Sequence, residues 1–475
     1  MVVGEFVEKR ELIIIGGGPA GYHAAIRSAK LGIQVTLIEQ AHLGGTCLNK
    51  GCIPSKVFSY TANKLASVEK LSTFGISVGD PFFHIDQLTS YKDKTIQQLR
   101  TGVEDLCQAN AVEVIQGKAN FINETRIGVE SDHQFTIFEF EKAIIATGSS
   151  PVLPDSLKDY SCILTEEDIY MLEKIPEELV IYGNNYLALE AAFSFRTLGA
   201  GVTMVLKGSD DFYFDSSINR ELKRILKRER IQVYRGYHLE QLTSKGKHIS
   251  LEFHKNDQQT FLSATHFYIQ TKHAPRIEGL GIERLAMDCT EDGFIRIDKK
   301  MRTNIPSIFA IGDVTGGKVS AVKAMKQGKV VAEIIAGLAS EVDLTMVPTV
   351  VHSIPPIAAV GLTEEEAKQL GYQIKTSLFR YSGNGYAMIA NEKSGIAKVI
   401  KDAKTDLLLG VHTIGASAIE LISTGITALE LASRDEDLKF PLYPHPSFNE
   451  ILLEAVEGLT ESAIHIKPKP VVHHK

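Results

Sequence analysis

The chain has 475 residues, 44% of them hydrophobic and 23% charged, so it can form about three domains that each bury a core. Its 51 basic and 58 acidic side chains give a net charge of −7, which excludes the broad positive field that holds nucleic acid or an anionic membrane. No apolar run reaches the roughly 18 residues of a membrane span, and the N-terminus does not read as a secretory signal. We therefore expect a cytoplasmic protein without nucleic-acid or membrane partners.

The first predicted unit is a strand, a turn, a helix and a second strand between residues 11 and 39. A G-x-G-x-x-G pattern follows the first strand and consists of Gly16, Gly18 and Gly21. In such a turn the first glycine permits the bend, the second admits a pyrophosphate, and the third lets the helix pack on the strand. Glu39 ends the second strand, where a carboxylate can accept hydrogen bonds from a ribose. These features predict a dinucleotide site.

Two of the five cysteines, Cys47 and Cys52, lie close together behind this unit, and the other three are isolated. A metal site would need a second pair of ligands at comparable spacing, and the sequence has none. A reversible dithiol is the better interpretation, because a redox disulfide needs one thiolate to attack and a partner to resolve it. A flavin held by the neighbouring unit could accept the electrons.

Later segments predict two more regions of regular structure. Residues 142–145 read as a buried strand, and the prolines after it suggest a domain boundary. Residues 179–206 repeat the strand, helix and strand of the first unit, 167 residues further on. Residues 218–230 predict a helix whose basic face we interpret as solvated rather than nucleic-acid binding. After residue 347 helix and strand signals mix, which favours an α+β domain.

The motifs resemble those of the pyridine nucleotide-disulfide oxidoreductases, and within that family the dihydrolipoamide dehydrogenases. Residues 44–56, GGTCLNKGCIPSK, resemble the active-disulfide signature of the family. Further similar segments follow in order over nearly the whole chain: Ala146-Thr147-Gly148 and residues 301–306, 309–314, 360–367, 410–412 and 445–450. The resemblance implies an α/β fold with two Rossmann-like dinucleotide-binding domains and a C-terminal α+β dimerisation domain.

The resemblance also implies domain limits and site residues. Residues 1–150, completed by 275–345, would bind FAD; residues 151–274 would bind NAD; and residues 346–475 would form the dimer interface. Cys47 would exchange with the dithiol substrate and Cys52 would lie against the flavin. The remaining residues implied to contact the cofactors are Gly16, Gly18, Gly21, Glu39, Thr46, Lys56, Thr147, Gly148 and Asp313 for FAD, and Gly183 and Ala188 for NAD.

Two further pairs take roles from the resemblance. Lys56 and Glu190 would form an ion pair beside the flavin. His445 would be the acid-base group, contributed by the other subunit of a homodimer and oriented by Glu450. From the residues alone, Ser447-x-x-Glu450 before an apolar run also predicts a helix capping box, and the two roles need not exclude each other.

The second nucleotide unit departs from the family pattern. Asn185 stands where the middle glycine would admit pyrophosphate, and Leu206 followed by Lys207 replaces the acid that would end the strand. Residues 272–275, KHAP, replace a Gly-Arg-x-Pro loop, and Tyr443 stands where a second histidine is usual. We expect NAD to bind, but more weakly than in typical relatives.

The resemblance thus implies an FAD-dependent disulfide oxidoreductase that oxidises dihydrolipoamide on the lipoyl-bearing subunits of 2-oxo acid dehydrogenase complexes, with NAD as acceptor. The missing acid after residues 202–205 leaves open an NADPH-dependent disulfide reductase of the glutathione or mercuric type. A flavoprotein paralogue with an impaired nucleotide site, acting as a binding subunit, is the alternative from another class.

Overall fold

The computed structural model describes residues 7–79, 81–131, 134–208, 210–245 and 248–467. Two compact units make up the chain. The first comprises residues 1–57, 84–173 and 271–344, and the second comprises residues 58–83, 174–270 and 345–475.

The first unit is built on a sheet with the strand order β3-β2-β1-β6-β5-β4, in which β16 also pairs with β6. Its strands are β1 (Val7–Ile15), β2 (Val35–Glu39), β3 (Glu113–Gln116), β4 (Lys118–Asn123), β5 (Arg126–Ser131), β6 (Gln134–Ile145) and β16 (Ile308–Ala310). The strands β1, β2, β3, β6 and β16 run parallel, so their carboxyl ends meet at one edge. The antiparallel strands β4 and β5 extend the sheet past β6.

The register brings three chain segments to that edge. Ile15, the last residue of β1, lies opposite Ile145 at the end of β6, and Ile145 lies opposite Ala310 at the end of β16. Parallel α/β sheets bind ligands outside the carboxyl ends of their strands. The glycine turn after β1, residues 146–148 and residues 311–313 therefore lie together.

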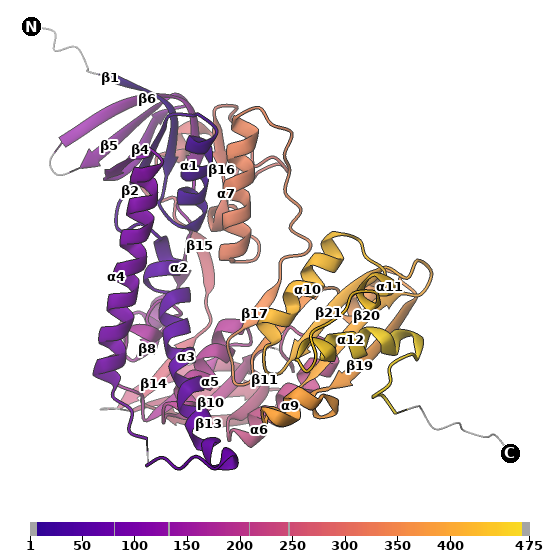
Figure 1. The fold of residues 1–475 in the computed structure, drawn as a ribbon. Coiled ribbons are helices and arrows are strands. Elements are labelled where there is room, and N and C mark those ends of the chain that lie inside the picture. The colour runs from indigo at the N-terminus through magenta and orange to yellow at the C-terminus, as the bar shows by residue number, and fades with distance from the viewer. Residues whose placement is uncertain (1–6, 80, 132–133, 209, 246–247, 468–475) are drawn as a thin grey trace, which may run out of the picture. The chain divides into compact units, whose positions relative to one another are not determined.

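Alternating side chains of β1 fill the two faces of this sheet. Leu12 and Ile14 pack with the helix residues Ala24 and Val331, whereas Ile13 and Ile15 enter a cluster on the other face. The helices α1 (Pro19–Lys30) and α7 (Ala321–Ile335) lie side by side (Figure 1). Their contact needs Gly328, because a β-carbon there would overlap the carbonyl oxygen of Ala20.

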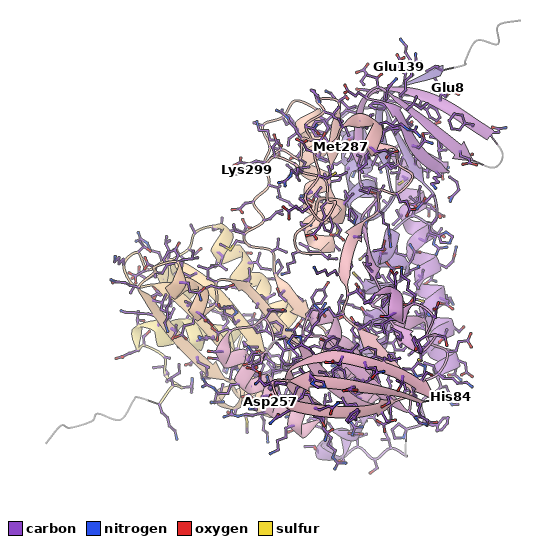
Figure 2. All side chains as sticks on the ribbon, turned by 180° about the vertical axis from the view of Figure 1, so that it is seen from behind. Glu8, His84, Glu139, Asp257, Met287 and Lys299 are labelled. Atoms are coloured by element: carbon purple, nitrogen blue, oxygen red, sulfur yellow. The ribbon has the colours of Figure 1, made fainter. Side chains whose placement is uncertain are left out.

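The outer ends of this sheet carry charged side chains. Glu139 of β6 lies opposite Lys9 of β1, and both Glu139 and Glu8 are labelled in Figure 2. The other elements of the unit are α2 (Gly45–Asn49), α4 (Ile85–Ala109), β7 (Ser149–Val152), η2 (Asp155–Leu157), β8 (Ile163–Leu164), η3 (Ile169–Met171), β15 (Lys272–Pro275), η4 (Ile282–Leu285) and η5 (Gly312–Thr315). Helix α3 (Cys52–Glu69) begins in this unit. The strands β7 and β15 form an antiparallel ladder.

The second unit contains another open sheet, in which the order β13-β12-β11-β10-β9-β14 is formed by its own strands. They are β9 (Glu178–Tyr182), β10 (Gly201–Lys207), β11 (Gln232–Lys245), β12 (His248–Lys255), β13 (Gln258–Ala264) and β14 (His266–Ile269). The strands β9, β10, β11 and β14 are parallel. The turn between β12 and β13 carries Asp257, which is labelled in Figure 2. Helix α5 (Tyr186–Thr197) follows β9, and α6 (Ser216–Arg228) follows β10.

An antiparallel sheet completes the second unit, with the order β17-β18-β21-β20-β19. Its strands are β17 (Thr349–Val351), β18 (Ile357–Gly361), β19 (Ile374–Arg380), β20 (Ile396–Asp402) and β21 (Leu408–Ile414). The remaining helices of the second unit are η1 (Leu71–Phe74), α8 (Glu364–Gln369), η6 (Tyr381–Gly383), α9 (Gly385–Ile389), α10 (Ala418–Glu430), α11 (Asp435–Lys439), α12 (Asn449–Glu457) and η7 (Gly458–Thr460). Apolar residues of α10 and α12 pack on the sheet and form one core with it.

The predicted strands and helices are confirmed, including both strand–helix–strand units and the mixed C-terminal region. The strand predicted over residues 142–145 is the end of the longer β6, whose first half pairs with β5. Among the described helices, none combines the length with the apolar character that crossing a bilayer requires.

Candidate active site

The first glycine turn brings backbone atoms together that side chains would keep apart. Gly16 has φ +101°, and a β-carbon there would lie 2.5 Å from the carbonyl oxygen of Ala146. A β-carbon at Gly21 would overlap the carbonyl oxygen of Gly16. Helix α1 begins after Gly18 and has no side-chain hydrogen bond at this cap. The amino end of α1 is therefore available to an anionic group.

A second pair of glycines joins the cysteine motif to this turn. Gly44 donates its N–H to the carbonyl oxygen of Gly17 at 2.8 Å. Gly45 has φ +55°, and a β-carbon there would lie 2.7 Å from the α-carbon of Gly18. Cys47 lies in α2, which starts at Gly45. The dithiol is thus held beside the dinucleotide turn by contact between backbones.

Cys47 and Cys52 are both thiols in this structure and both are partly buried. A hydrogen bond with Cys52, together with burial, raises the pKa of the Cys47 thiol far above its usual value. Cys52 is the first residue of α3, where the helix dipole favours a negative charge. In the reduced pair, Cys47 therefore holds its proton more tightly than an ordinary thiol does.

The strand edge offers groups that fit the flavin nucleotide that the resemblance implies. Within the described part of the chain, the buried hydroxyl of Thr147 has no hydrogen-bond partner. Gly148 has φ +76°, and nothing lies within 4 Å of the position of a β-carbon there. Asp313 follows β16 at the same edge, in η5. A large polar ligand could bind the unpaired hydroxyl of Thr147, approach the backbone at Gly148 and contact the amino end of α1.

Glu39 binds the backbone on both of its oxygens. Its Oε2 accepts from Gly17 N–H at 2.6 Å and its Oε1 accepts from Ala41 N–H at 2.8 Å. These bonds fix the carboxylate at the end of β2, beside the glycine turn. Each oxygen keeps a lone pair, so the role toward a ribose stays a prediction.

Asp313 lies next to a buried lysine. Lys323 Nζ is 3.7 Å from Asp313 Oδ1 and donates to the carbonyl oxygen of Gly316 at 2.7 Å. Burial lowers the pKa of Lys323, although the nearby Asp313 opposes this change. Asp313 Oδ1 also accepts from Ser320 N–H at 3.3 Å. These contacts orient the carboxylate toward the amino end of α7.

A network that the sequence did not reveal surrounds Thr46. Arg276 donates to Thr46 Oγ1 at 3.1 Å and to Glu167 Oε1 at 2.7 Å. Lys50 Nζ reaches the other oxygen of Glu167 at 3.2 Å. The network ties both ends of α2, and hence Cys47, to residues more than a hundred positions away. No local pattern around Arg276 or Glu167 signals this role.

The predicted pair of Lys56 and Glu190 is divided between the units. Lys56 lies in α3 within the first unit, and its charge lowers the pKa of Cys47 against the larger opposing effects. Glu190 lies in α5 of the second unit, is fully buried, and accepts from His352 N–H at 2.9 Å. Their ion pair stays a prediction.

His445 and Glu450 are in direct contact. His445 Nδ1 lies 2.7 Å from Glu450 Oε1, while Glu450 Oε2 accepts from Ser447 N–H at 2.9 Å. Burial tends to raise the pKa of Glu450, but the hydrogen bonds from His445 and Ser447 outweigh it and lower that pKa. The histidine side chain is 80% exposed. Glu450 contacts Nδ1, so Nε2 is the ring nitrogen left for other partners.

The predicted capping box is only half formed. Helix α12 begins at Asn449, and its cap residue Phe448 makes no side-chain hydrogen bond there. Ser447 Oγ accepts from Asn449 N–H at 3.2 Å, and the bond from Ser447 N–H to Glu450 supplies the reciprocal contact. The same carboxylate therefore serves the helix start with one oxygen and His445 with the other.

The second glycine turn differs from the first in its hydrogen bonds. Gly183 directly follows β9 and Ala188 is fully buried in α5, as a dinucleotide turn requires. Gln270 Oε1 accepts from Asn184 N–H at 2.9 Å and from Asn185 N–H at 3.1 Å. Asn185 Oδ1 accepts from Ala188 N–H at 2.9 Å. As the turn stands, these donors do not fit a pyrophosphate, because side chains of the protein already bind them.

Neither Leu206 nor Lys207, the last two residues of β10, carries a side-chain acceptor for a ribose. Leu206 is fully buried, and Lys207 Nζ lies 5.7 Å from the centre of the Tyr182 ring. The lysine is exposed, so it could meet a phosphate.

Comparison with protein families gives two matches. Residues 10–328 match the pyridine nucleotide-disulphide oxidoreductase family, and residues 347–456 match its dimerisation domain. The chain belongs to the pyridine nucleotide-disulphide oxidoreductases. The predicted family, fold class and carboxyl-terminal dimerisation domain are confirmed.

Curated relatives are dihydrolipoyl (dihydrolipoamide) dehydrogenases. That of Bacillus subtilis is 33% identical over 98% of this chain and 100% of its own length. That of Thermus scotoductus is 36% identical over 96% of this chain and 98% of its own. The chain is an FAD-dependent disulfide oxidoreductase of the dihydrolipoyl dehydrogenase class, whose cofactors are FAD and NAD, as the sequence predicts.

Two solved structures share the fold of this chain. LpdA from Mycobacterium tuberculosis has a TM-score of 0.88 at 24% identity, covering 95% of this chain and 100% of its own. The HOCl-induced flavoprotein disulfide reductase RclA from Escherichia coli, in a Cu(II) complex, has a TM-score of 0.85 at 26% identity, covering 95% and 99%.

Proposed function

We propose that this pyridine nucleotide-disulphide oxidoreductase oxidises dihydrolipoamide carried by the lipoyl-bearing subunits of 2-oxo acid dehydrogenase complexes, with NAD⁺ as the acceptor. The observation that carries the proposal is the dithiol of Cys47 and Cys52, which the contact of Gly45 with Gly18 fixes beside the dinucleotide turn. The curated relatives that match almost the full chain are named dihydrolipoyl dehydrogenases, which supports the substrate part of the proposal.

The residues divide the chemistry between them. In the oxidised enzyme, a substrate thiolate attacks Cys47 and breaks its bond to Cys52, which leaves as a thiolate stabilised at the start of α3. The second substrate thiol then displaces Cys47, which yields the substrate disulfide and the reduced pair. Bound FAD would supply the acceptor for the two electrons of the reduced pair and the hydride donor toward NAD⁺. Gly16, Gly18, Gly21, Glu39, Thr46, Lys56, Thr147, Gly148 and Asp313 would hold it.

His445 would supply the acid-base step. Its exposed Nε2 removes a proton from the substrate thiol, and Glu450 at Nδ1 keeps the ring oriented and stabilises the imidazolium. This pair acts on the dithiol of the other subunit in our proposal. Lys56 and Glu190 would act as an ion pair beside the flavin.

A homodimer follows from the dimerisation domain and from the surface near His445. Phe440 is 91% exposed and Leu442 is 100% exposed in the described chain. Large apolar side chains this close to a proposed catalytic residue favour burial against a second copy. We also propose that residues 1–150 with 275–345 bind FAD, 151–274 bind NAD and 346–475 form the interface.

The test is anaerobic reduction of the purified flavoprotein by dihydrolipoamide, followed by addition of NAD⁺ or NADP⁺. We expect the flavin absorbance to bleach and then to return with NAD⁺. Return with NADP⁺ alone would favour the NADPH-dependent disulfide reductase, which the exposed Lys207 at the end of β10 would suit. Bleaching without return on addition of either nucleotide would favour a binding subunit with an impaired nucleotide site, and no bleaching would contradict dihydrolipoamide as the substrate. Cell fractionation would test the predicted cytoplasmic location.

A further inference from the structure

Gln270 reaches the second glycine turn from a neighbouring strand end. Ile269, the last residue of β14, lies opposite Tyr182 at the end of β9, and Gln270 N–H donates to the carbonyl oxygen of Tyr182 at 2.9 Å. This register places the Gln270 side chain over Gly183, where a β-carbon would lie 2.7 Å from the Gln270 Cβ. The carboxamide oxygen then meets two consecutive backbone N–H groups, those of Asn184 and Asn185.

The two glycine turns have the same backbone at the helix cap but different occupants. The cap residues Gly18 and Asn185 have φ and ψ of −70° and −175°, and of −83° and 176°. At Gly18 no side chain caps the helix, whereas Asn185 caps α5 with its own Oδ1. Asn185 therefore fits without strain and turns its side chain onto its own helix. The second turn keeps the shape of a dinucleotide site while its N–H groups are bound internally.

A carboxamide oxygen that accepts from consecutive backbone N–H groups makes the contacts that a phosphate oxygen would make. The turn also contains a buried hydrogen-bond donor without an acceptor in the described chain. Asn184 is 2% exposed, and its Nδ2 has no hydrogen-bond partner within the described residues. A buried donor without an acceptor favours a ligand at this turn. The turn has therefore kept its capacity to bind a nucleotide, and the Gln270 carboxamide occupies the N–H groups that the nucleotide would use.

We infer that Gln270 determines nucleotide affinity by competing with the pyrophosphate for the N–H groups of Asn184 and Asn185. This inference rests on the proposed use of NAD⁺. The nucleotide binds only when the carboxamide leaves, so the free energy of its two hydrogen bonds is subtracted from binding. Gln270 thus acts as an affinity-determining residue and not as a catalytic one.

The experiment is calorimetric titration of the full-length oxidised flavoprotein with NAD⁺ and with ADP-ribose, without thiol substrate. Gln270→Ala removes the competing oxygen and should lower both Kd values about tenfold. Gln270→Glu keeps the acceptor and adds a negative charge that repels the phosphates, so it should raise both Kd values by at least a similar factor. Gln241→Ala, at an exposed position of β11 in the same unit, should change neither.

A lower Kd in Gln270→Ala together with a higher Kd in Gln270→Glu would show competition, whereas a purely structural role would not shift the two Kd values in opposite directions. If Gln270→Ala binds NAD⁺ no better than the wild type, or more weakly, the inference is wrong. Flavin content and thermal midpoint report whether each variant is folded, and if the alanine variant does not fold, Gln270→Ser and the glutamate variant test the same order. Hydrogen exchange adds an independent readout, because a peptide covering residues 183–188 should exchange faster in Gln270→Ala without nucleotide.

The binding result and the proposed function can fail separately. If dihydrolipoamide does not reduce the flavin, the proposed substrate is wrong, but the order of Kd values still decides the role of Gln270. If reduction proceeds and the Kd values do not follow the predicted order, the inference fails and the dithiol chemistry stands.

Discussion

Gly45 lies against Gly18 so closely that a β-carbon on Gly45 would be 2.7 Å from the Gly18 α-carbon. This contact joins the segment that carries the dithiol to the turn that would bind the flavin nucleotide. The two sites are held together by backbone, so their geometry does not depend on long side chains.

Gly45→Ala should therefore reduce stability and flavin retention together. The left-handed φ of +55° costs about 1–2 kcal/mol for alanine, and the overlap with Gly18 adds about 1–3 kcal/mol. Gly32→Ala is the matched control, because Gly32 has φ +88° but open space around it. Denaturant unfolding and flavin absorbance per chain measure both effects. Equal losses in the two variants, with flavin retained, would refute the contact's importance.

Removing Cys47 should expose the charge on Cys52. In Cys47→Ser, the start of α3 still stabilises a Cys52 thiolate, and a thiolate beside oxidised flavin absorbs at wavelengths beyond the flavin's own bands. The unreduced variant should show this absorbance, Cys52→Ser should lack it, and both should lose turnover. Cys289→Ser, at an isolated and partly buried cysteine, should behave as the wild type does. Long-wavelength absorbance in Cys52→Ser would reverse the assignment of the two thiols.

A dimer with composite sites should show complementation. Cys47→Ser and His445→Gln subunits are each expected to be inactive, but a heterodimer has one site that keeps both groups. A statistical mixture formed by refolding the two variants together should regain about a quarter of wild-type activity. Sedimentation and turnover assays check this. A monomer, or a mixture without recovery, would place His445 outside the proposed site.

Breaking the buried ion pair of Lys398 and Asp215 should destabilise the second unit. Lys398 Nζ lies 2.9 Å from both Asp215 oxygens, with side chains 3% and 1% exposed. Lys398→Met strands a buried carboxylate and should cost about 3–5 kcal/mol. Lys158→Met, in the exposed pair with Asp155, should cost about 0–1 kcal/mol. Urea unfolding measures the free energy of unfolding of both variants, and equal losses in Lys398→Met and Lys158→Met would contradict this prediction.

The same pair predicts how stability depends on pH. Burial tends to raise the pKa of Asp215, but hydrogen bonds from Lys398 and from backbone N–H groups outweigh it and lower that pKa below its ordinary 3.8. A lowered carboxyl pKa stabilises the fold above the ordinary value, and this stabilisation is lost as pH falls through the folded one. Asp215→Asn with Lys398→Met should flatten the thermal midpoint against pH below about 4 relative to the wild type. An unchanged slope would show that other carboxylates dominate acid unfolding.

The sequence predicted those parts of the site that depend on short spacing. Gly16, Gly18 and Gly21 lie within one turn and its helix, and the dithiol lies within six residues, so their chemistry can be recognised locally. Asn185 was correctly identified as a departure, but its side chain caps α5 instead of standing in the approach to the turn. The direction of the Asn185 side chain depends on its rotamer, which the spacing of residues in the sequence does not reveal.

The residues that the sequence did not reveal act over long separations. Gln270 meets Asn184 only because β14 pairs with β9 in one register, and a shift of one residue would turn its side chain to the other face. Arg276 reaches Thr46 across 230 positions of the chain. Such contacts follow from how strands are ordered in the sheets, and no local motif encodes them.

The divided use of Glu450 has an evolutionary consequence. One oxygen supports the start of α12 and the other holds His445. With His445 in its proposed acid-base role, selection for a stable dimerisation domain and selection for turnover would act on the same carboxylate. A descendant that had lost catalysis would still gain from keeping Glu450, whereas its exposed histidine would be free to drift. In surveys of such descendants, the histidine is therefore the better marker of retained activity.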